Sequence, residues 1–423
     1  DGTNWGLNEN IYPLSDTVWL PNHNLSIQTD SSNVLKTDAA SPEVSYIPRI
    51  SMPAIIHIAV DRELNLWWDT IALYEKKYNN LRFQVVCSKG LTLERGFRFS
   101  PPQSSVGVDY PITIIAKNLN GKTLQTVNST IRVVSKTAGT GTKNILMVGD
   151  SRTWQNIGDV QGSATYTGGT GNKTITTELK ALMLANLGAS PVFIGNQVSA
   201  LDSAVRNEAT SGVGIDYYTN PSSPFYDSVG ARLDFKKYMT AQGKTGQNID
   251  IVTVMLGVND IWSSSSNDAG LDLSIVAESK ISGYINNMKH FITKVLDATY
   301  GFPSAKIVFV IESTTSNMNG FGDWYGTVAT KGNLEQMACE KALHKLREEA
   351  ILAFDNFAYN ANVYVSAGAL LCDRTYGFPY VMKAPSARAS TATEMYHKNS
   401  IHPHDDGYKQ IADGIFSTIK AIV

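Results

Sequence analysis

The pattern of hydrophobic and polar positions changes character once along the chain. Over residues 49–135, short β-rich runs alternate with turn signals, a pattern typical of a small, Ig-like β-sandwich. The Asn120-Gly121 dipeptide between two of these runs is a strong hairpin signal. The predicted strands are Ile55–Val60, Leu64–Trp68, Leu81–Val86, Phe97–Ser100, Tyr110–Ala116 and Ser129–Val134.

Over residues 144–423 the apolar runs alternate with helical periods instead. This alternation predicts an α/β fold, a three-layer α/β/α domain with a parallel sheet covered by helices on both sides. We expect Asp405 or Asp406 to cap the last helix, whose apolar face begins at Tyr408. The predicted strands are Ile145–Val148, Pro191–Gly195, Ile249–Leu256, Lys306–Ile311 and Val363–Val365, and the other predicted helices are Ile175–Asn186, Leu273–Ala298 and Leu334–Phe354.

Two polar segments flank the β-rich region. Residues 1–48 are expected to be an irregular lead-in that packs on something else or ends a lost upstream domain, and residues 136–143 are expected to be a linker. Inside the β-rich region, Trp67 and Trp68 are adjacent, so only one of them can face the core of a strand. We expect the other at a domain interface or, alternatively, in a sugar contact.

Charge and composition narrow the class of partner. The chain of 423 residues has 36 Lys+Arg against 38 Asp+Glu, a net charge of −2. This balance argues against a nucleic acid partner, because phosphate binding needs a cationic surface. Charged residues make up 17%, below the roughly 25% of a typical soluble domain. Such a polar, uncharged surface is compatible with a protein that works outside the cytoplasm.

Neither a membrane span nor a metal site is predicted. No stretch of 18 consecutive apolar residues occurs, and a leader peptide is expected to be absent or already removed. The three widely spaced cysteines fit neither a disulfide framework nor a zinc pattern. We therefore expect no cofactor and no metal.

Three short polar motifs follow predicted strands or precede the last helix. Gly149-Asp150-Ser151 ends the first strand of the α/β region, and Gly257-Val258-Asn259-Asp260 ends a later one. In parallel sheets the ligand site lies at these carboxyl ends, so the Ser is expected in the cleft and the Asn could donate a hydrogen bond to an oxyanion there. His402-Pro403, directly before the last helix, could supply an acid/base group.

In this order the motifs resemble those of the SGNH, or GDSL, hydrolase family. A further block, Asn207–Gly212, looks like the form found in carbohydrate-esterase branches of that family. The resemblance covers about residues 144–423. It implies that Ser151 is the nucleophile and His402 the base. It also implies an oxyanion hole made by the backbone N–H groups of Ser151 and Gly212 and the side chain of Asn259.

One position departs from the family pattern. The family usually has Asp three residues before the catalytic His, and this chain has Asn399. An amide oxygen could still accept a hydrogen bond from the imidazole, but it cannot supply a negative charge. Three alternatives follow: a working Ser-His-Asn site or Ser-His dyad, rescue by Asp405 or Asp406, or a weakened or inactive enzyme.

The expected substrate is an acetylated polysaccharide. Four stretches are expected to be long inserted loops: 155–172, 216–246, 314–331 and 373–398. Aromatic residues on these loops could stack on sugars, and Asp150, Trp154 and Trp262 are the predicted substrate contacts next to the catalytic motifs. We therefore expect an esterase that removes O-acetyl or other short acyl groups from a surface or cell-wall glycan. The alternatives are a lipid esterase of the same family and a weakened carbohydrate-binding or structural module of a phage tail or secreted protein. An oligomer is possible.

Overall fold

The structure is a computed structural model in which the chain forms two compact units, Asp1–Ile47 and Pro48–Val423. In the first unit, β1 (Thr17–Trp19), β2 (Ser26–Thr29) and β3 (Leu35–Thr37) form an antiparallel sheet. The segment predicted to be irregular thus contains strands, which are too short for their alternation to stand out. The residues described are 17–19, 26–29, 35–37, 48–73, 81–154, 173–186, 188–199, 202–261, 278–312, 315–316, 336–355, 361–386, 388, 391–397, 399 and 401–423.

The N-terminal part of the second unit is a β region with two main sheets. One sheet has the order β5-β12-β11-β8, and the other has the order β6-β10-β9. Side chains that alternate along β5, β11 and β12 are fully buried, among them Ile56, Ile114 and Ile131, and they share a core with Leu66 and Phe97 of the second sheet. The elements are β4 (Arg49–Ile50), β5 (Ile55–Ala59), β6 (Leu64–Trp67), α1 (Trp68–Ile71), β7 (Ala72–Leu73), β8 (Leu81–Val86), β9 (Leu91–Thr92), β10 (Gly96–Phe99), η3 (Gln103–Ser105), β11 (Asp109–Asn118) and β12 (Thr123–Val134).

The hairpin predicted at Asn120-Gly121 joins β11 to β12. Its loop is longer than a two-residue turn, because the last paired residues are Lys117 and Thr123. Hydrogen bonds from Gly121 N to Asn118 O and from Asn118 N to Lys122 O close it, both at 3.0 Å. The dipeptide therefore marked the turn correctly, although the surrounding residues lengthen it.

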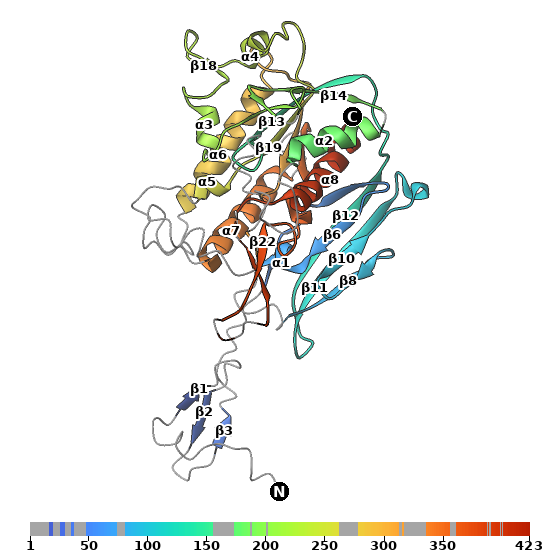
Figure 1. Cartoon of the computed structure of the whole chain (residues 1–423), viewed down its shortest axis with the longest axis vertical. Helices are drawn as coiled ribbons and strands as arrows, with labels where there is room; N and C mark the ends of the chain where they lie inside the picture. Colours follow the sequence, from blue (N-terminus) through green and yellow to red (C-terminus); the bar gives the residue numbers. More distant parts are fainter. Residues whose placement is uncertain are drawn as a thin grey trace. The chain divides into compact units, whose positions relative to one another are not determined.

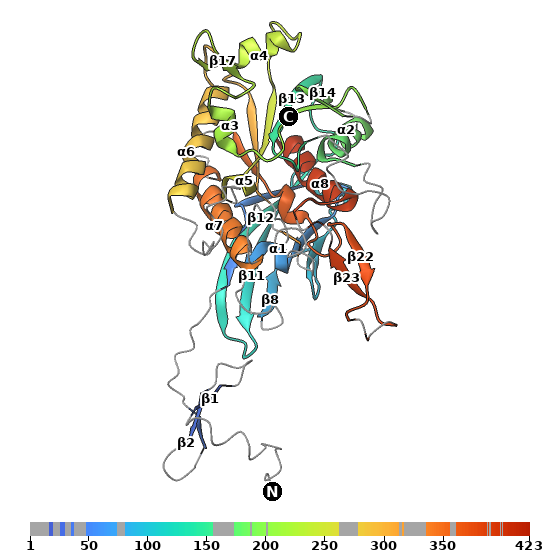
Figure 2. The same ribbon diagram turned by 60° about the vertical axis from the view of Figure 1, so that its left-hand side comes forward.

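The rest of the second unit is built on a seven-stranded sheet with the path β15-β16-β13-β19-β20-β21, and β14 also pairs with β13 (Figures 1 and 2). Except for the antiparallel β15–β16 pair, neighbouring strands are parallel. β13 lies inside the sheet, between β19 and the pair β14 and β16. The strands are β13 (Thr142–Gly149), β14 (Ser190–Ile194), β15 (Gln197–Val198), β16 (Arg206–Ala209), β19 (Ile251–Met255), β20 (Lys306–Val310) and β21 (Val363–Ser366).

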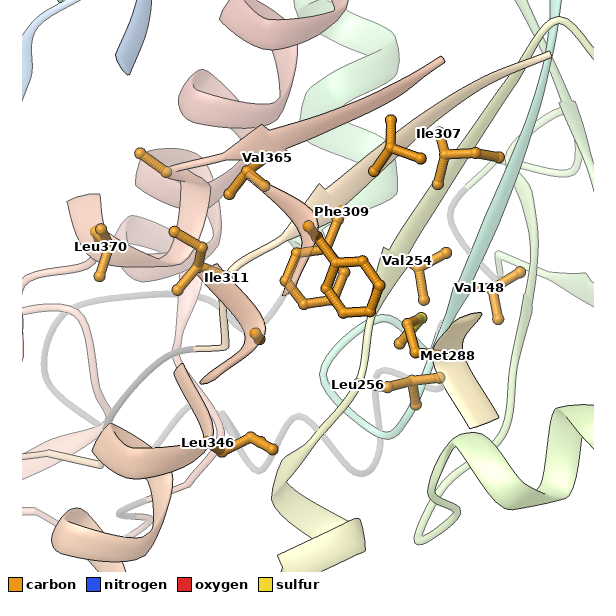
Figure 3. Packing of buried hydrophobic residues seen from close by; sticks show 14 of the residues in the cluster. Val148, Val254, Leu256, Met288, Ile307, Phe309, Ile311, Leu346, Val365 and Leu370 are labelled. Carbon is orange, nitrogen blue, oxygen red and sulfur yellow. The ribbon is translucent and has the colours of Figure 1, made fainter. Parts of the chain in front are cut away.

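Helices cover both faces of this sheet, so the α/β fold predicted from the sequence is confirmed. On one face, Val148, Val254 and Phe309 pack with Met288 of α6 and Leu346 of α7 (Figure 3). On the other face, alternate strand residues pack against α2 and α8. The helices are α2 (Ile175–Ala185), α3 (Ile215–Thr219), α4 (Phe235–Ala241), α5 (Val258–Ile261), α6 (Glu278–Val295), α7 (Gln336–Phe354) and α8 (Asp405–Ile422).

Helix α8 begins differently from the prediction. Its N-cap is His404, whose Nδ1 accepts a hydrogen bond from Asp406 N at 3.1 Å. Asp405 and Asp406 instead lie in the first turn, where negative charge complements the helix dipole. No helix in the described part of the chain is both long and apolar enough to cross a membrane.

Several stretches expected to be inserted loops carry secondary structure. Residues 216–246 contain most of α3, all of α4 and a two-stranded ladder of β17 (Tyr226–Asp227) and β18 (Arg232–Leu233). Residues 373–398 contain the hairpin of β22 (Tyr380–Lys383) and β23 (Glu394–His397). The stretch 155–172 and most of 314–331 lie outside the described residues.

The β region packs directly on the sheet-and-helix region. The backbone N–H of Ala59 in β5 donates to Ser417 Oγ in α8 at 3.0 Å. Ala59 and Val134 also belong to the same hydrophobic cluster as the buried face of α8. The strand β13 already begins at Thr142, so the last two residues of the predicted linker belong to the sheet.

Candidate active site

Ser151 stands in a tight turn at the carboxyl end of β13. The backbone N–H groups of Thr153 and Trp154 donate to Asp150 O at 3.1 and 3.0 Å, which turns the chain sharply after the strand. The Ser151 side chain is half-buried and reaches His402, whose Nε2 lies 2.8 Å from Ser151 Oγ. Two residues separated by 251 positions thus meet within hydrogen-bond distance.

Asn399 holds the other side of the His402 ring. Its Nδ2 lies 3.0 Å from His402 Nδ1, and its Oδ1 accepts hydrogen bonds from Ile401 N at 3.0 Å and His402 N at 2.9 Å. The side chain is fully buried. Because only an oxygen can accept from the two backbone N–H groups, the amide nitrogen must be the atom that faces the imidazole.

This orientation is opposite to the one that would support catalysis through the amide oxygen. An amide N–H can only donate, so His402 Nδ1 must accept and the ring proton must sit on Nε2. In that tautomer, Nε2 has no lone pair with which to take the proton of Ser151. Turning the amide around would lose two hydrogen bonds to backbone, each contributing about 1 kcal/mol. The structure therefore places Asn399 beside His402 but sets the unproductive tautomer.

The Asn399 amide occupies the position beside His402 Nδ1 where a carboxylate would accept a hydrogen bond. Both ring nitrogens of His402 already have a partner, Ser151 on one side and Asn399 on the other. Asp405 Oδ1 accepts from Lys173 N at 3.2 Å, and Asp406 pairs with Lys409 at 2.9 Å. Rescue by Asp405 or Asp406 stays a prediction from the sequence.

Asn259 links the turn after β13 to the loop before α3. Its Nδ2 donates to Asp150 Oδ2 at 3.2 Å and to Val213 O at 3.1 Å. Gly212, next to Val213, is exposed and has a φ of +77°, a left-handed conformation that glycine adopts without strain. Both N–H bonds of the Asn259 amide thus have partners, so stabilising an oxyanion requires one of them to turn towards substrate.

Asp150 was predicted to touch substrate, and the structure shows this to be wrong. Its side chain is fully buried, with Oδ1 accepting from Arg152 N at 2.9 Å and Oδ2 accepting from Asn259. Burial first, and the neighbouring Glu312 carboxylate second, raise the pKa of Asp150 well above its ordinary value. Asp150 therefore stabilises the turn that carries Ser151 from its buried side.

A buried ion pair behind Ser151 was missed by sequence reasoning. Arg152, which follows Ser151, pairs with Glu312 just after β20, and both side chains are almost fully buried. The available signal was a charged residue at the carboxyl end of a strand, as in the two motifs that were recognised. Asp260 joins this acidic region, and burial raises its pKa to about 7.

The structure describes one of the two tryptophans predicted to contact sugar. Trp154 is half-buried, and its Nε1 donates to Gln197 Oε1 at 3.1 Å, which anchors it to β15. Trp262 lies outside the described residues. Among the residues that the structure describes, no group of three or more His, Cys, Asp and Glu could hold a metal ion.

Comparison with known proteins places the site in a family. A family model described as GDSL-like Lipase/Acylhydrolase matches residues 145–415. No curated protein matches the chain.

Two solved structures show only weak similarity. A 2,6-sialyltransferase from Vibrionaceae Photobacterium sp. JT-ISH-224 is 11% identical, with a TM-score of 0.18, over 62% of this chain and 54% of that chain. A sialyltransferase from Photobacterium damsela is 12% identical, with a TM-score of 0.16, over 60% of this chain and 55% of that chain. The chain thus spans just over half the length of each of these two structures.

Proposed function

Because the chain belongs to the GDSL-like lipase/acylhydrolase family and is an ester hydrolase by that membership, we propose that it removes short acyl groups, acetyl above all, from a carbohydrate. The observation that carries the proposal is the 2.8 Å contact between Ser151 Oγ and His402 Nε2 at the carboxyl end of β13. An acetylated bacterial surface or cell-wall polysaccharide would be the substrate. Such a substrate fits a secreted or virion-associated protein.

The reaction we propose begins at the hydroxyl of Ser151. Its Oγ attacks the acyl carbonyl carbon while His402 Nε2 takes the hydroxyl proton. The carbonyl oxygen becomes an oxyanion, for which the N–H groups of Ser151 and Gly212 and the amide of Asn259 are the proposed donors. His402 then gives its proton to the sugar oxygen, which leaves as a hydroxyl while the acyl group stays on Ser151 Oγ. Water next attacks the acyl carbon while His402 takes a proton from it, and His402 returns that proton to Ser151 Oγ as the free acid is released.

The Asn399 amide sets the limit of this mechanism. His402 can accept the proton only when its ring carries hydrogen on Nδ1, and that hydrogen would face the N–H of Asn399. In a trypsin-like triad, the corresponding Asp-to-Asn change costs about 10⁴ in rate, because the wrong tautomer is held. We therefore propose slow turnover at neutral pH.

Acetate release from a panel of acetylated glycans tests the proposal, with aryl acetate as an activated reference and Ser151→Ala as the control. Turnover of acetyl esters that is absent from the control supports it. Aryl esters of increasing chain length separate this function from a lipid esterase, which would prefer the long acyl chains. Preference for long chains, or release that persists in Ser151→Ala, would contradict the proposal.

The same Asn399 geometry favours a second candidate, a carbohydrate-binding module with a weakened active site. Such a module would bind the glycan without releasing acetate, and Ser151→Ala would leave binding unchanged. Calorimetric titration of the chain with acetylated and deacetylated glycan distinguishes the two. An enzyme on the proposed route releases acetate during the titration, whereas a module shows binding heat alone.

A further inference from the structure

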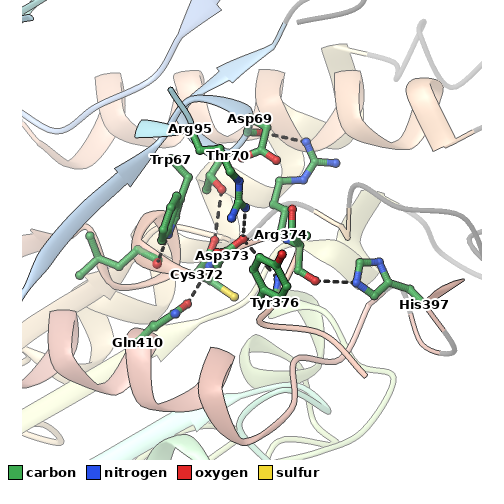
Figure 4. A network of polar contacts seen from close by, with 12 residues as sticks. Trp67, Asp69, Thr70, Arg95, Cys372, Asp373, Arg374, Tyr376, His397 and Gln410 are labelled. Atoms are coloured by element: carbon green, nitrogen blue, oxygen red, sulfur yellow. Dashed lines mark hydrogen bonds and ion pairs between the residues drawn. The ribbon is translucent and has the colours of Figure 1, made fainter. Parts of the chain in front are cut away.

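The β region is hydrogen-bonded to one turn of the sheet-and-helix region, residues 371–377 (Figure 4). Trp67 Nε1 donates to Leu371 O at 3.0 Å, and Thr70 Oγ1 donates to Cys372 O at 3.1 Å. Arg374 Nη1 donates to Asp69 O at 2.7 Å in the opposite direction. Trp67 is therefore an interface residue, one of the two alternatives expected for this pair of tryptophans, while Trp68 packs in the core against Phe83.

An ion pair adds to the hydrogen bonds between the β region and this turn. Arg95, between β9 and β10, donates from Nη2 to Asp373 Oδ1 at 2.6 Å. The guanidinium carbon of Arg95 lies 4.9 Å from the centre of the Trp67 ring and 5.2 Å from the centre of the Tyr376 ring. Cation–π attraction to these rings favours this position of the guanidinium. The Asp373 side chain is only 5% exposed, and its Oδ1 also accepts from Thr375 N at 2.8 Å. Arg95 thus holds a carboxylate that itself shapes the turn.

The other side of the same turn touches the segment that carries His402. Gly377 N donates to Asp373 O at 2.7 Å, and His404 N donates to Gly377 O at 2.9 Å. The two backbones approach so closely that a Cβ on Gly407 would lie 2.3 Å from Gly377 O. Asp373 N also donates to Gln410 Oε1 of α8 at 2.7 Å. The turn is therefore fixed against the start of α8, two residues after His402.

The strand before Asn399 is tied to the turn as well. His397, the last residue of β23, has its Nε2 2.8 Å from Thr375 O. His397 is fully buried, and burial lowers its pKa to about 4. The neutral ring therefore donates from Nε2 to the carbonyl. The His402 segment is thus bound to the turn both before Asn399 and after His402.

We propose that Arg95 is a positioning residue for the esterase reaction. It acts through Asp373 and the turn 371–377 to fix the segment that places His402 against Ser151. The β region would thereby be part of the catalytic unit. This inference rests on the proposed function for its kinetic test, but the geometry it invokes can be measured without turnover.

The test compares Arg95→Ala with Arg98→Ala in the full chain. Arg98 is the matched control, because it lies in β10 with a similarly exposed side chain but pairs with Glu63 and Asn65 inside the β region. On aryl acetate we expect Arg95→Ala to lower kcat by about 10- to 100-fold with little change in KM, as a displaced catalytic group does. Arg98→Ala should change neither.

Two further variants separate positioning from general destabilisation. Arg95→Lys keeps the charge and should recover part of kcat, and the exchange Arg95→Asp with Asp373→Arg should recover more than either single change. If Arg95→Ala and Arg98→Ala lower kcat equally, or if neither rescue exceeds Arg95→Ala, the positioning role is wrong.

A readout without turnover keeps the two proposals apart. In protein labelled with ¹⁵N-histidine, the ring signals of His402, assigned by their loss in His402→Ala, should shift in Arg95→Ala and stay in place in Arg98→Ala. If the unmodified chain shows no hydrolysis and the His402 signals still shift in Arg95→Ala, the proposed function fails and the positioning role stands. If the His402 signals do not shift in Arg95→Ala, the positioning role is wrong, whatever activity the chain has.

Discussion

The amide nitrogen of Asn399 lies 3.0 Å from Nδ1 of His402, while the amide oxygen is held by the backbone N–H groups of Ile401 and His402. A carboxylate in the same place could accept all three hydrogen bonds, because both of its oxygens are acceptors. The amide can satisfy only the backbone pair in that way. The orientation of the Asn399 amide thus decides which nitrogen of the His402 imidazole carries the proton.

Asn399→Asp should raise kcat. The substituted carboxylate would accept from His402 Nδ1, leave Nε2 free to take the Ser151 proton, and stabilise the imidazolium that forms. By comparison with the cost of the reverse change in a trypsin-like triad, we expect a gain of 10²- to about 10⁴-fold at neutral pH. Initial rates on aryl acetate measure it.

Ser151→Ala in the Asn399→Asp background is the control, and it should remove the gain entirely. A loss of activity in Asn399→Asp with an unchanged melting temperature would mean that the amide has a role in binding or chemistry that its geometry does not reveal. An unchanged rate would mean that proton transfer to His402 does not limit turnover.

Asn259→Ala should reduce both activity and stability. Asp150 and Val213 would each lose the donor that Asn259 supplies, and leaving a buried carboxylate less well paired costs roughly 1–3 kcal/mol. If the amide also turns to the oxyanion, kcat falls by about 10²- to 10³-fold. Chemical denaturation gives the first quantity, and kinetics in the Asn399→Asp background give the second. A fall in kcat below threefold would exclude the oxyanion role.

Gly407→Ala and Gly283→Ala should have opposite effects, although both glycines lie in helices. The space around a Cβ on Gly283 in α6 is open, so alanine should stabilise the helix by up to about 1 kcal/mol. A Cβ on Gly407 would collide with Gly377 O and Pro403 Cβ and push the turn away from the His402 segment. We expect a higher melting temperature for Gly283→Ala, and a lower one together with reduced kcat for Gly407→Ala. Equal melting temperatures would show that the contact between the turn and α8 yields easily.

Asp260→Asn should flatten the dependence of stability on pH. The folded-state pKa of Asp260 is about 7, above its ordinary value of 3.8, so the folded protein keeps a proton between about pH 4 and 7 that the unfolded chain has released. The free energy of unfolding therefore falls as pH rises through this window, by at most about 4 kcal/mol for this group.

Asparagine preserves the acceptor for Ile215 N, which Asp260 Oδ1 binds at 2.9 Å, without a titrating proton. Melting temperatures of both proteins from pH 4 to pH 8 check the expectation. The melting temperature of the variant should rise relative to that of the unmodified chain as the pH increases. If the two melting temperatures change in parallel with pH, Asp260 does not titrate in this range.

The sequence by itself determined the α/β fold and the motifs at the ends of its strands. Buried strands and helices leave periodic apolar patterns, so Ile251–Met255 and the face of α8 could be recognised directly. Gly149-Asp150-Ser151 and Gly257-Val258-Asn259-Asp260 could be assigned to one site because parallel strands end at one edge of a sheet. His402-Pro403 joined them through the order of motifs that resembles the SGNH, or GDSL, hydrolase family.

Only the tertiary structure decided how the side chains of the site face one another. The orientation of the Asn399 amide depends on two backbone N–H groups that fold back onto it, and the type of residue does not reveal this. The burial of Asp150 depends on Arg152, Glu312 and Asn259 converging from three strand ends. The pairing of Arg95 with Asp373 spans 278 positions. Contacts between distant segments follow from packing in three dimensions, and no periodicity along the chain records them.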